Sequence, residues 1–186
     1  MMKRCVAVAV AVLAVVLGLT ESVMAGDIFG ARLRGFEETP VPIATAGQGF
    51  FLGTPNASGT QIDYTLFYFG LGSAVSASHI HFGPPGISGG VVLFLCTNGA
   101  PPAGVPVPPA CPNNPGVNSV SGTLTAANVI AVPLQGIGAG AFADVIDAMR
   151  GLTAYVNVHT ATYGGGEIRS HRLCTHRLER VPWGVA

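Results

Sequence analysis

The sequence predicts an all-β protein, a sandwich or barrel of short strands with one short helix. Strand signals recur about every ten to fifteen residues between clusters of Gly, Pro and Asn, a pattern typical of sandwiches and barrels. Only one segment has the hydrophobic period of a helix. A length of 186 residues has room for one domain of ordinary size.

The expected strands are short, and the clearest is 61–69. Apolar residues occupy the even positions from 62 to 68, and polar residues occupy 61, 63 and 65, so one face of this strand is expected to be buried. We expect strands, rich in Val, Ile, Thr and aromatic residues, at 28–33, 49–52, 61–69, 75–82, 91–95, 119–124, 154–158 and 167–173.

Three segments depart from the strand pattern. Residues 101–115 contain seven of the fourteen prolines, which cannot donate hydrogen bonds to a sheet, so we expect an exposed loop. Residues 141–150 place four apolar side chains at helical spacing ahead of Gly151, which predicts the short helix. Residues 175–186 have no clear period and are expected to form a C-terminal tail.

The composition excludes two classes of protein. The chain is 49% hydrophobic and only 10% charged, against roughly 25% charged in an average soluble protein, so it is not a charge-rich disordered chain. Nine Lys and Arg balance nine Asp and Glu. Because there is no basic excess to neutralise phosphates, we expect no nucleic-acid partner.

The first 25 residues have the pattern of a signal peptide. Basic residues at 3–4 precede fourteen apolar residues at 6–19, and a small-x-small pattern at 23–25 suits cleavage before Gly26. The apolar run is too short to span a bilayer of about 30 Å comfortably, so we expect no transmembrane segment in the mature chain. The sequence therefore predicts an exported protein, either secreted or located in the periplasm or cell envelope.

Three cysteines follow the predicted cleavage site. Cys96 and Cys111 lie close in the chain and are expected to form a disulfide, which the chain-entropy model values at about 3 kcal/mol. Cys174 is the odd one out. A free thiol, an intermolecular disulfide, reshuffling among the three cysteines and a metal role all stay open for it.

Three of the five histidines lie on two segments that we expect to be neighbouring strands. His79 and His81 share one face of their strand, and Asn157 and His159 share one face of theirs. If these faces meet, three imidazoles can bind Zn²⁺ or Cu²⁺ with one position left open. The alternative is a clasp at one end of the domain, in which the imidazoles hydrogen-bond loop carbonyls and carboxylates. Ring nitrogens within about 3–4 Å of a common point favour the metal.

Glu167 and Arg169 complete the candidate site, together with Asn157, as a ligand site or as part of the clasp. Glu167 is a candidate fourth metal ligand, but its spacing of two from Arg169 favours an ion pair on one strand face. Residues 164–166, all glycine, are expected to form a hairpin loop. The singly placed histidines are expected on the solvated surface; they are His171 and His176.

Three ordered segments make the chain resemble the CHRD domain family, named for chordin and also found in many exported bacterial proteins. Residues 31–40, ARLRGFEETP, resemble an opening L-x-G-x-x-E-x-P stretch. Residues 78–83, SHIHFG, resemble A-H-I-H-x-G, with serine in place of the first alanine. Residues 155–160, YVNVHT, and 166–169, GEIR, resemble a closing Y-x-N-V-H-T … G-E-I-R-G element in which serine replaces the last glycine.

The resemblance implies an antiparallel immunoglobulin-like, Greek-key β-sandwich at residues 26–174. In chordin such domains belong to an extracellular antagonist of growth-factor signalling, but family and fold alone do not transfer that function. A His-x-His pair on a sandwich strand is also similar to copper–zinc superoxide dismutase. The bridging histidine and the zinc-loop aspartate of that enzyme have no evident counterpart in this sequence.

Three functional hypotheses follow. The chain has no phosphate-binding loop and no G-x-S-x-G, Cys-x-x-Cys or His-Glu-x-x-His motif, so the leading hypothesis is an exported, non-enzymatic binding or interaction module for an unidentified extracellular or envelope partner. The second is a metalloprotein or metalloenzyme that uses His79, His81 and His159 with Zn or Cu as cofactor. The third is a structural protein of the cell envelope, which the low charge and the proline-rich loop favour.

Overall fold

All the strands that the structure describes belong to one antiparallel sheet. The computed structural model describes residues 27–170 and 173–177. Within them the sheet order is β5-β4-β7-β8-β1-β2-β3-β6, and β9 also pairs with β1. The strands are β1 (Asp27–Arg34), β2 (Gln48–Pro55), β3 (Gln61–Phe69), β4 (Val75–Phe82), β5 (Gly90–Thr97), β6 (Asn118–Thr125), β7 (Ala154–Thr160), β8 (Ile168–Ser170) and β9 (Cys174–Arg177). The helices are α1 (Phe142–Arg150) and three 3-10 turns, η1 (Gly35–Glu37), η2 (Ala126–Asn128) and η3 (Pro133–Gln135).

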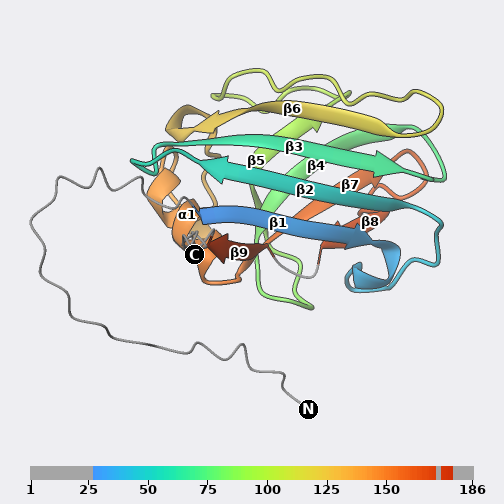
Figure 1. Cartoon of the computed structure of the whole chain (residues 1–186), viewed down its shortest axis with the longest axis horizontal. Helices are drawn as coiled ribbons and strands as arrows, with labels where there is room; N and C mark the ends of the chain where they lie inside the picture. The colour runs from blue at the N-terminus through green and yellow to red at the C-terminus, as the bar shows by residue number, and fades with distance from the viewer. Residues whose placement is uncertain (1–26, 171–172, 178–186) are drawn as a thin grey trace, which may run out of the picture.

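The sheet curls so that two layers face each other (Figure 1). Strands β1, β2, β3 and β6 form the front layer, and β4, β5 and β7 lie behind them. Strand β8 pairs with both β7 and β1 and so joins the layers along one side. The strands at the two ends of the order, β5 and β6, approach each other on the other side. The result is a nearly closed barrel with its apolar core between the layers.

This architecture confirms the predicted all-β class, the antiparallel pairing and the short helix. The immunoglobulin-like Greek-key sandwich is corrected to a single barrel-like sheet. The reason is β8, which hydrogen-bonds to a strand of each layer, so the layers are not two separate sheets.

The two layers bury their strands differently. In β3 the apolar residues Ile62, Tyr64, Leu66 and Tyr68 are buried, and the residues between them are not, as the alternation predicts. In β7 six of the seven residues are buried, and most of β4 is buried as well. One face of β4 and β7 packs on the core, so other parts of the chain must cover their second face. That covered second face carries the candidate site.

The last strand was not predicted. Residues 175–177 were expected to belong to an irregular tail, but they continue β9, which pairs with the beginning of β1. Within the described residues, strand β8 spans Ile168–Ser170 and pairs with β1 at Leu33 and Arg34. Strand β9 pairs with β1 at Asp27–Gly30.

The predicted disulfide between Cys96 and Cys111 is present. It anchors the proline-rich segment, and the Tyr68 hydroxyl donates a hydrogen bond to the Pro112 carbonyl 2.6 Å away. The predicted signal peptide at 1–25 and most of the predicted tail lie outside the described residues, as do the side chains of Cys174, His171 and His176. Among the helices of the described part, none is long and apolar enough to cross a membrane.

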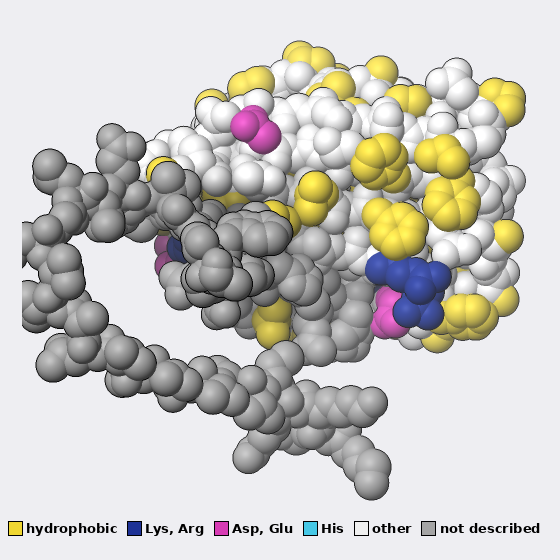
Figure 2. All heavy atoms as spheres, in the orientation of Figure 1, with side chains coloured by type: hydrophobic (Ala, Val, Ile, Leu, Met, Phe, Trp, Pro, Cys, Tyr) yellow, Lys and Arg dark blue, Asp and Glu magenta, His cyan; other side chains and the backbone are white. Residues whose placement is uncertain are grey.

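The outer face of the front layer carries few charges and several exposed apolar side chains (Figure 2). Phe50 and Phe67 are paired across β2 and β3 and are both exposed. The guanidinium carbon of Arg32 lies 5.9 Å from the centre of the Phe50 ring. The histidines lie on the opposite layer.

Candidate functional site

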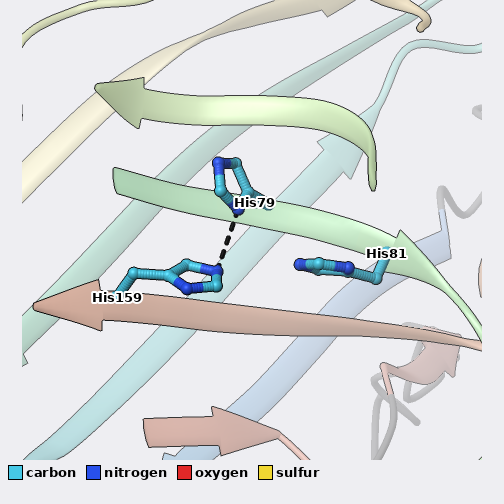
Figure 3. Close-up of side chains that lie close together, drawn as sticks. All are labelled: His79, His81 and His159. Carbon is cyan, nitrogen blue, oxygen red and sulfur yellow. Dashed lines mark hydrogen bonds between the residues drawn. The ribbon is translucent and has the colours of Figure 1, made fainter. Parts of the chain in front are cut away.

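The candidate site lies on the outer face of β4 and β7. In the pairing of these strands His79 is opposite Asn157, and His81 is opposite Tyr155, so all four side chains share a face. Ile80, between the two histidines, points into the core and is fully buried. The histidines therefore face away from the interior of the barrel (Figure 3).

Three histidines from these two strands come together. Nδ1 of His79 lies 3.0 Å from Nε2 of His159 (Figure 3). The ring centres of His79 and His81 are 5.5 Å apart, and those of His81 and His159 are 6.1 Å apart. Each histidine offers one ring nitrogen, and these atoms lie within 4.8 Å of one another. His79 and His81 are only 8% exposed although they face outward.

The hydrogen bonds of the rings fix where their protons sit. Nδ1 of His81 lies 3.0 Å from the carbonyl oxygen of Gly89, and Nδ1 of His159 lies 2.9 Å from that of Gly164. A carbonyl oxygen only accepts, so both Nδ1 atoms carry a proton. Nε2 of His159 is then a lone pair and accepts from Nδ1–H of His79. We infer that all three rings are neutral, with Nε2 unprotonated.

Two of these lone pairs have no partner. Among the described residues, Nε2 of His79 and Nε2 of His81 are buried without any hydrogen bond. Leaving a buried acceptor unsatisfied costs about 1–3 kcal/mol. Both atoms belong to rings that lie close to a third imidazole, that of His159.

The pKa values agree with neutral rings. Burial, reinforced by the neighbouring histidines, lowers the pKa of His79 to about 3. Burial lowers the pKa of His81 to about 4, although the hydrogen bond to Gly89 opposes it. Burial also lowers the pKa of His159. Neutral imidazole is the form that binds a metal ion, so binding needs no net loss of protons from these rings at neutral pH, only a shift of the His79 proton from Nδ1, which faces His159, to Nε2.

The cluster matches the donor set of a metal site. Ligand atoms at 2.0–2.1 Å from a tetrahedral zinc ion lie about 3.4 Å from each other. The ring nitrogens of the three histidines lie within 4.8 Å of one another, so any two of them need to approach by about 1.5 Å at most. Nδ1–H donation to backbone carbonyls is also the usual way in which proteins orient metal-binding histidines. The residues present fit a transition-metal ion.

A stack of side chains continues from His81 across the face. The ring of Tyr155 lies parallel to that of His81, with 4.8 Å between the centres and 7° between the planes. The guanidinium carbon of Arg169 lies 3.4 Å from the centre of the Tyr155 ring. Arg169 is almost fully buried, and its Nη2 donates to the carbonyl of Ile87, 2.7 Å away. A buried positive charge is thus separated from His81 by one ring.

Glu38 supplies a carboxylate to the same face. Asn157 Nδ2 donates to both Glu38 oxygens at 3.2 Å, and Glu38 is 6% exposed. Burial raises the pKa of Glu38 to about 7, while the positive charge of Arg169 opposes this shift. Glu38 was not among the predicted site residues. It occupies the glutamate position of the L-x-G-x-x-E-x-P stretch at 33–40, so the sequence contained a signal for it. Asn157 Oδ1 is a further buried atom without a hydrogen bond among the described residues.

Glu167 does not pair with Arg169 as expected. Its oxygens accept hydrogen bonds from the Thr45 hydroxyl (2.6 Å), the Gly72 N–H (2.8 Å) and the Thr160 hydroxyl (2.8 Å). The acidic side chains that act electrostatically on Arg169 are Glu38 and Glu37. The reason is that β8 begins at Ile168, so the alternation of faces does not extend back to Glu167. Glu167 also lies outside the group of potential ligands that contains the three histidines.

The glycine segment 164–166 is a loop, as predicted, and it contacts the site at two positions. Gly164 provides the carbonyl that orients His159. Gly166 has φ 129°, and a Cβ there would lie 2.4 Å from Asn157 Nδ2 and 2.7 Å from Glu38 Oε1. Only glycine fits this position.

The three segments that converge here are those that carry the family resemblance. The family model of the CHRD domain matches residues 29–171 of the chain. That range includes every residue placed in the site above. No curated protein and no solved structure shows a significant match to the chain.

Proposed function

The chain belongs to the CHRD domain family, and from that premise we propose that it is an exported binding module whose three-histidine cluster holds a transition-metal ion, Zn²⁺ or Cu²⁺. The observation that carries the proposal is that His79, His81 and His159 each offer one ring nitrogen and that these three atoms lie within 4.8 Å of one another. A metal ion bound there by Nε2 of His81 also removes the cost of burying that atom unsatisfied.

The chemistry of the donors selects the kind of ion. Imidazole nitrogens suit Zn²⁺ and Cu²⁺, whereas Ca²⁺ and Mg²⁺ prefer oxygen ligands. For a given set of nitrogen donors Cu²⁺ binds more tightly than Zn²⁺. The potential ligand group in the described part of the chain consists of three histidines, which leaves a fourth position for water or an external ligand.

Export is the second part of the proposal. The signal-peptide pattern of the first 25 residues supports it, and so does the disulfide between Cys96 and Cys111, because disulfides persist in oxidising compartments outside the cytosol. An exported domain meets metal ions that are not buffered by cytosolic thiols.

A purely structural clasp is the competing function for the same residues. The hydrogen bonds from His81 to Gly89 and from His159 to Gly164 tie loops to the strands without any ion. The clasp leaves Nε2 of His81 unpaired among the described residues, and this favours the metal.

Metal content decides between the two. Protein without a histidine tag, stripped with a chelator and dialysed against Zn²⁺, Cu²⁺ or Ca²⁺, is analysed by mass spectrometry. We expect about one equivalent of Zn or Cu and no retained Ca. The variants His79→Ala and His159→Ala should lose the metal, and Asp63→Asn, an exposed acidic residue of the front layer, should keep it. Less than about a tenth of an equivalent of both metals in folded wild-type protein rejects the proposal.

A further inference from the structure

Arg169 is an unusual neighbour for a site that accepts cations. Its guanidinium lies on one ring, Tyr155, and that ring stacks on His81. Both side chains are buried, so solvent screens this charge poorly. An unbalanced Arg169 therefore opposes any positive charge placed on the histidine cluster.

Glu38 is the carboxylate that balances it. Asn157, directly opposite His79 in the strand pairing, holds both oxygens of Glu38 on the same face. The groups that act on Glu38 are Arg169 from β8, Asn157 from β7 and the Thr39 N–H beside it. Tyr155 and Glu37 are the remaining groups that act on Arg169. Glu38 and Arg169 are thus two buried groups of opposite charge that act on each other electrostatically.

We propose that ionised Glu38 is what allows the three histidines to hold a metal ion next to Arg169, and that protonation of Glu38 weakens metal binding. The inference rests on the proposed function and adds its regulation. With Glu38 ionised, the charges of the pair cancel before the metal arrives. With Glu38 protonated, the metal and Arg169 are two buried cations with no counter-charge between them.

The titration range of Glu38 makes this coupling accessible in ordinary conditions. Burial raises the pKa of Glu38 from 4.5 to about 7, so its charge changes around neutral pH. The electrostatic interaction between the charge of Glu38 and a metal ion several ångströms away corresponds to about a tenfold change in the affinity for the metal. Metal is then held more tightly above neutral pH and released more readily in mild acid.

The test is a Zn²⁺ titration against a competing chelator at about pH 6 and about pH 8, corrected for the protonation of the chelator. Four forms are compared: wild type, Glu38→Gln, Arg169→Gln and the double variant. Between about pH 8 and about pH 6, we expect the affinity of the wild type to fall about tenfold more than the affinity of Glu38→Gln falls. Glu38→Gln should be weak at both values, and the double variant should regain the affinity of the wild type at the higher pH.

The comparison separates the two proposals. Protons that compete with Zn²⁺ for the histidines affect wild type and Glu38→Gln equally. A difference between their pH profiles of Zn²⁺ affinity is therefore caused by Glu38. Equal profiles, or a double variant as weak as Glu38→Gln, overturn the role of Glu38 while leaving metal binding in place. No Zn²⁺ binding by the wild type at either pH overturns both proposals. If circular dichroism shows that the double variant is unfolded, the profiles of wild type and Glu38→Gln decide alone.

Discussion

Nδ1 of His79 and Nε2 of His159, from strands that are 80 positions apart in the chain, lie 3.0 Å from each other. The contact means that one ring donates and the other accepts, so the two imidazoles cannot both carry a second proton without repulsion. It also gives the histidine cluster a defined arrangement before any ion arrives.

The metal-free protein should lose stability in mild acid because of this cluster. The pKa values of His79 and His81 fall from 6.5 to about 3 and about 4 on folding, so their contribution is complete above pH 6.5 and is lost as pH falls. We expect a loss of about 2 kcal/mol per histidine between pH 6.5 and 5, measured by urea unfolding.

Two variants should change this loss of stability in acid in opposite directions. His79→Asn should flatten the pH dependence. The pKa of Glu38 is raised on folding, so Glu38 stabilises the protein as pH falls below about 7, and Glu38→Gln should make the acid loss steeper. A free energy of unfolding of Glu38→Gln that is flat from pH 7 to 5 would contradict neutral, buried histidines, because the opposing contribution of Glu38 is absent from this variant.

Gly166→Ala should destabilise the protein by about 2–3 kcal/mol. The residue has φ 129°, and the added Cβ would collide with Asn157 and Glu38. Gly164→Ala is the matched control from the same loop, because no atom lies within 4 Å of the position of its Cβ. Thermal and urea unfolding measure both. Equal effects of the two substitutions would show that the close approach at Gly166 is unimportant.

The stack on His81 predicts a difference between two substitutions of Tyr155. Tyr155→Phe keeps the ring that lies parallel to His81 and should bind Zn²⁺ or Cu²⁺ with nearly the wild-type affinity. Tyr155→Leu removes the flat surface, leaves His81 free to rotate and should weaken binding about tenfold. The electron paramagnetic resonance spectrum of the Cu²⁺ form should change only in the leucine variant. Identical spectra and affinities in both would exclude an orienting role for the ring.

Replacing both Cys96 and Cys111 by serine should lower the free energy of unfolding by about 3 kcal/mol, because the open chain regains the entropy of the loop between them. Denaturant unfolding of the oxidised wild type and the variant gives the difference. Reduction of the wild type should reproduce the result. A variant with the wild-type midpoint would mean that the hydrogen bonds of the proline-rich segment suffice to hold it.

The sequence predicted the strands better than their arrangement. The bounds expected for β3 and β4 agree with the structure, because β3 alternates strictly between apolar and polar residues. Strand β9 was missed because four residues with mixed polarity become a strand only when the β1 edge is free to pair with them. Whether a sheet closes depends on such pairings, which the period of one strand does not contain.

The candidate site was predicted in part for the same reason. The shared faces of His79 with His81, and of Asn157 with His159, follow from a period of two, but their meeting depends on the pairing of β4 with β7. Tyr155, on the face predicted for Asn157 and His159, was not proposed as a site residue. Glu38 reaches the site from outside any strand, so no alternation could place it there. The expected ion pair between Glu167 and Arg169 was wrong because the alternation was extended back past the beginning of β8.

One face of strands β4 and β7 packs on the core, and the other face carries the histidines. The roof over the histidines consists of loops. His81 and His159 donate to the carbonyls of Gly89 and Gly164, and the first loop is also held by Gly89 N–H on the Tyr155 hydroxyl and by Arg169 on Ile87. Such a roof can lift while the barrel beneath it stays folded, so exchange of an ion with the surroundings requires only a local opening. Backbone amides near those two glycines should accordingly exchange with deuterium much faster than the amides of the strands below, and slow down once an ion occupies the pocket.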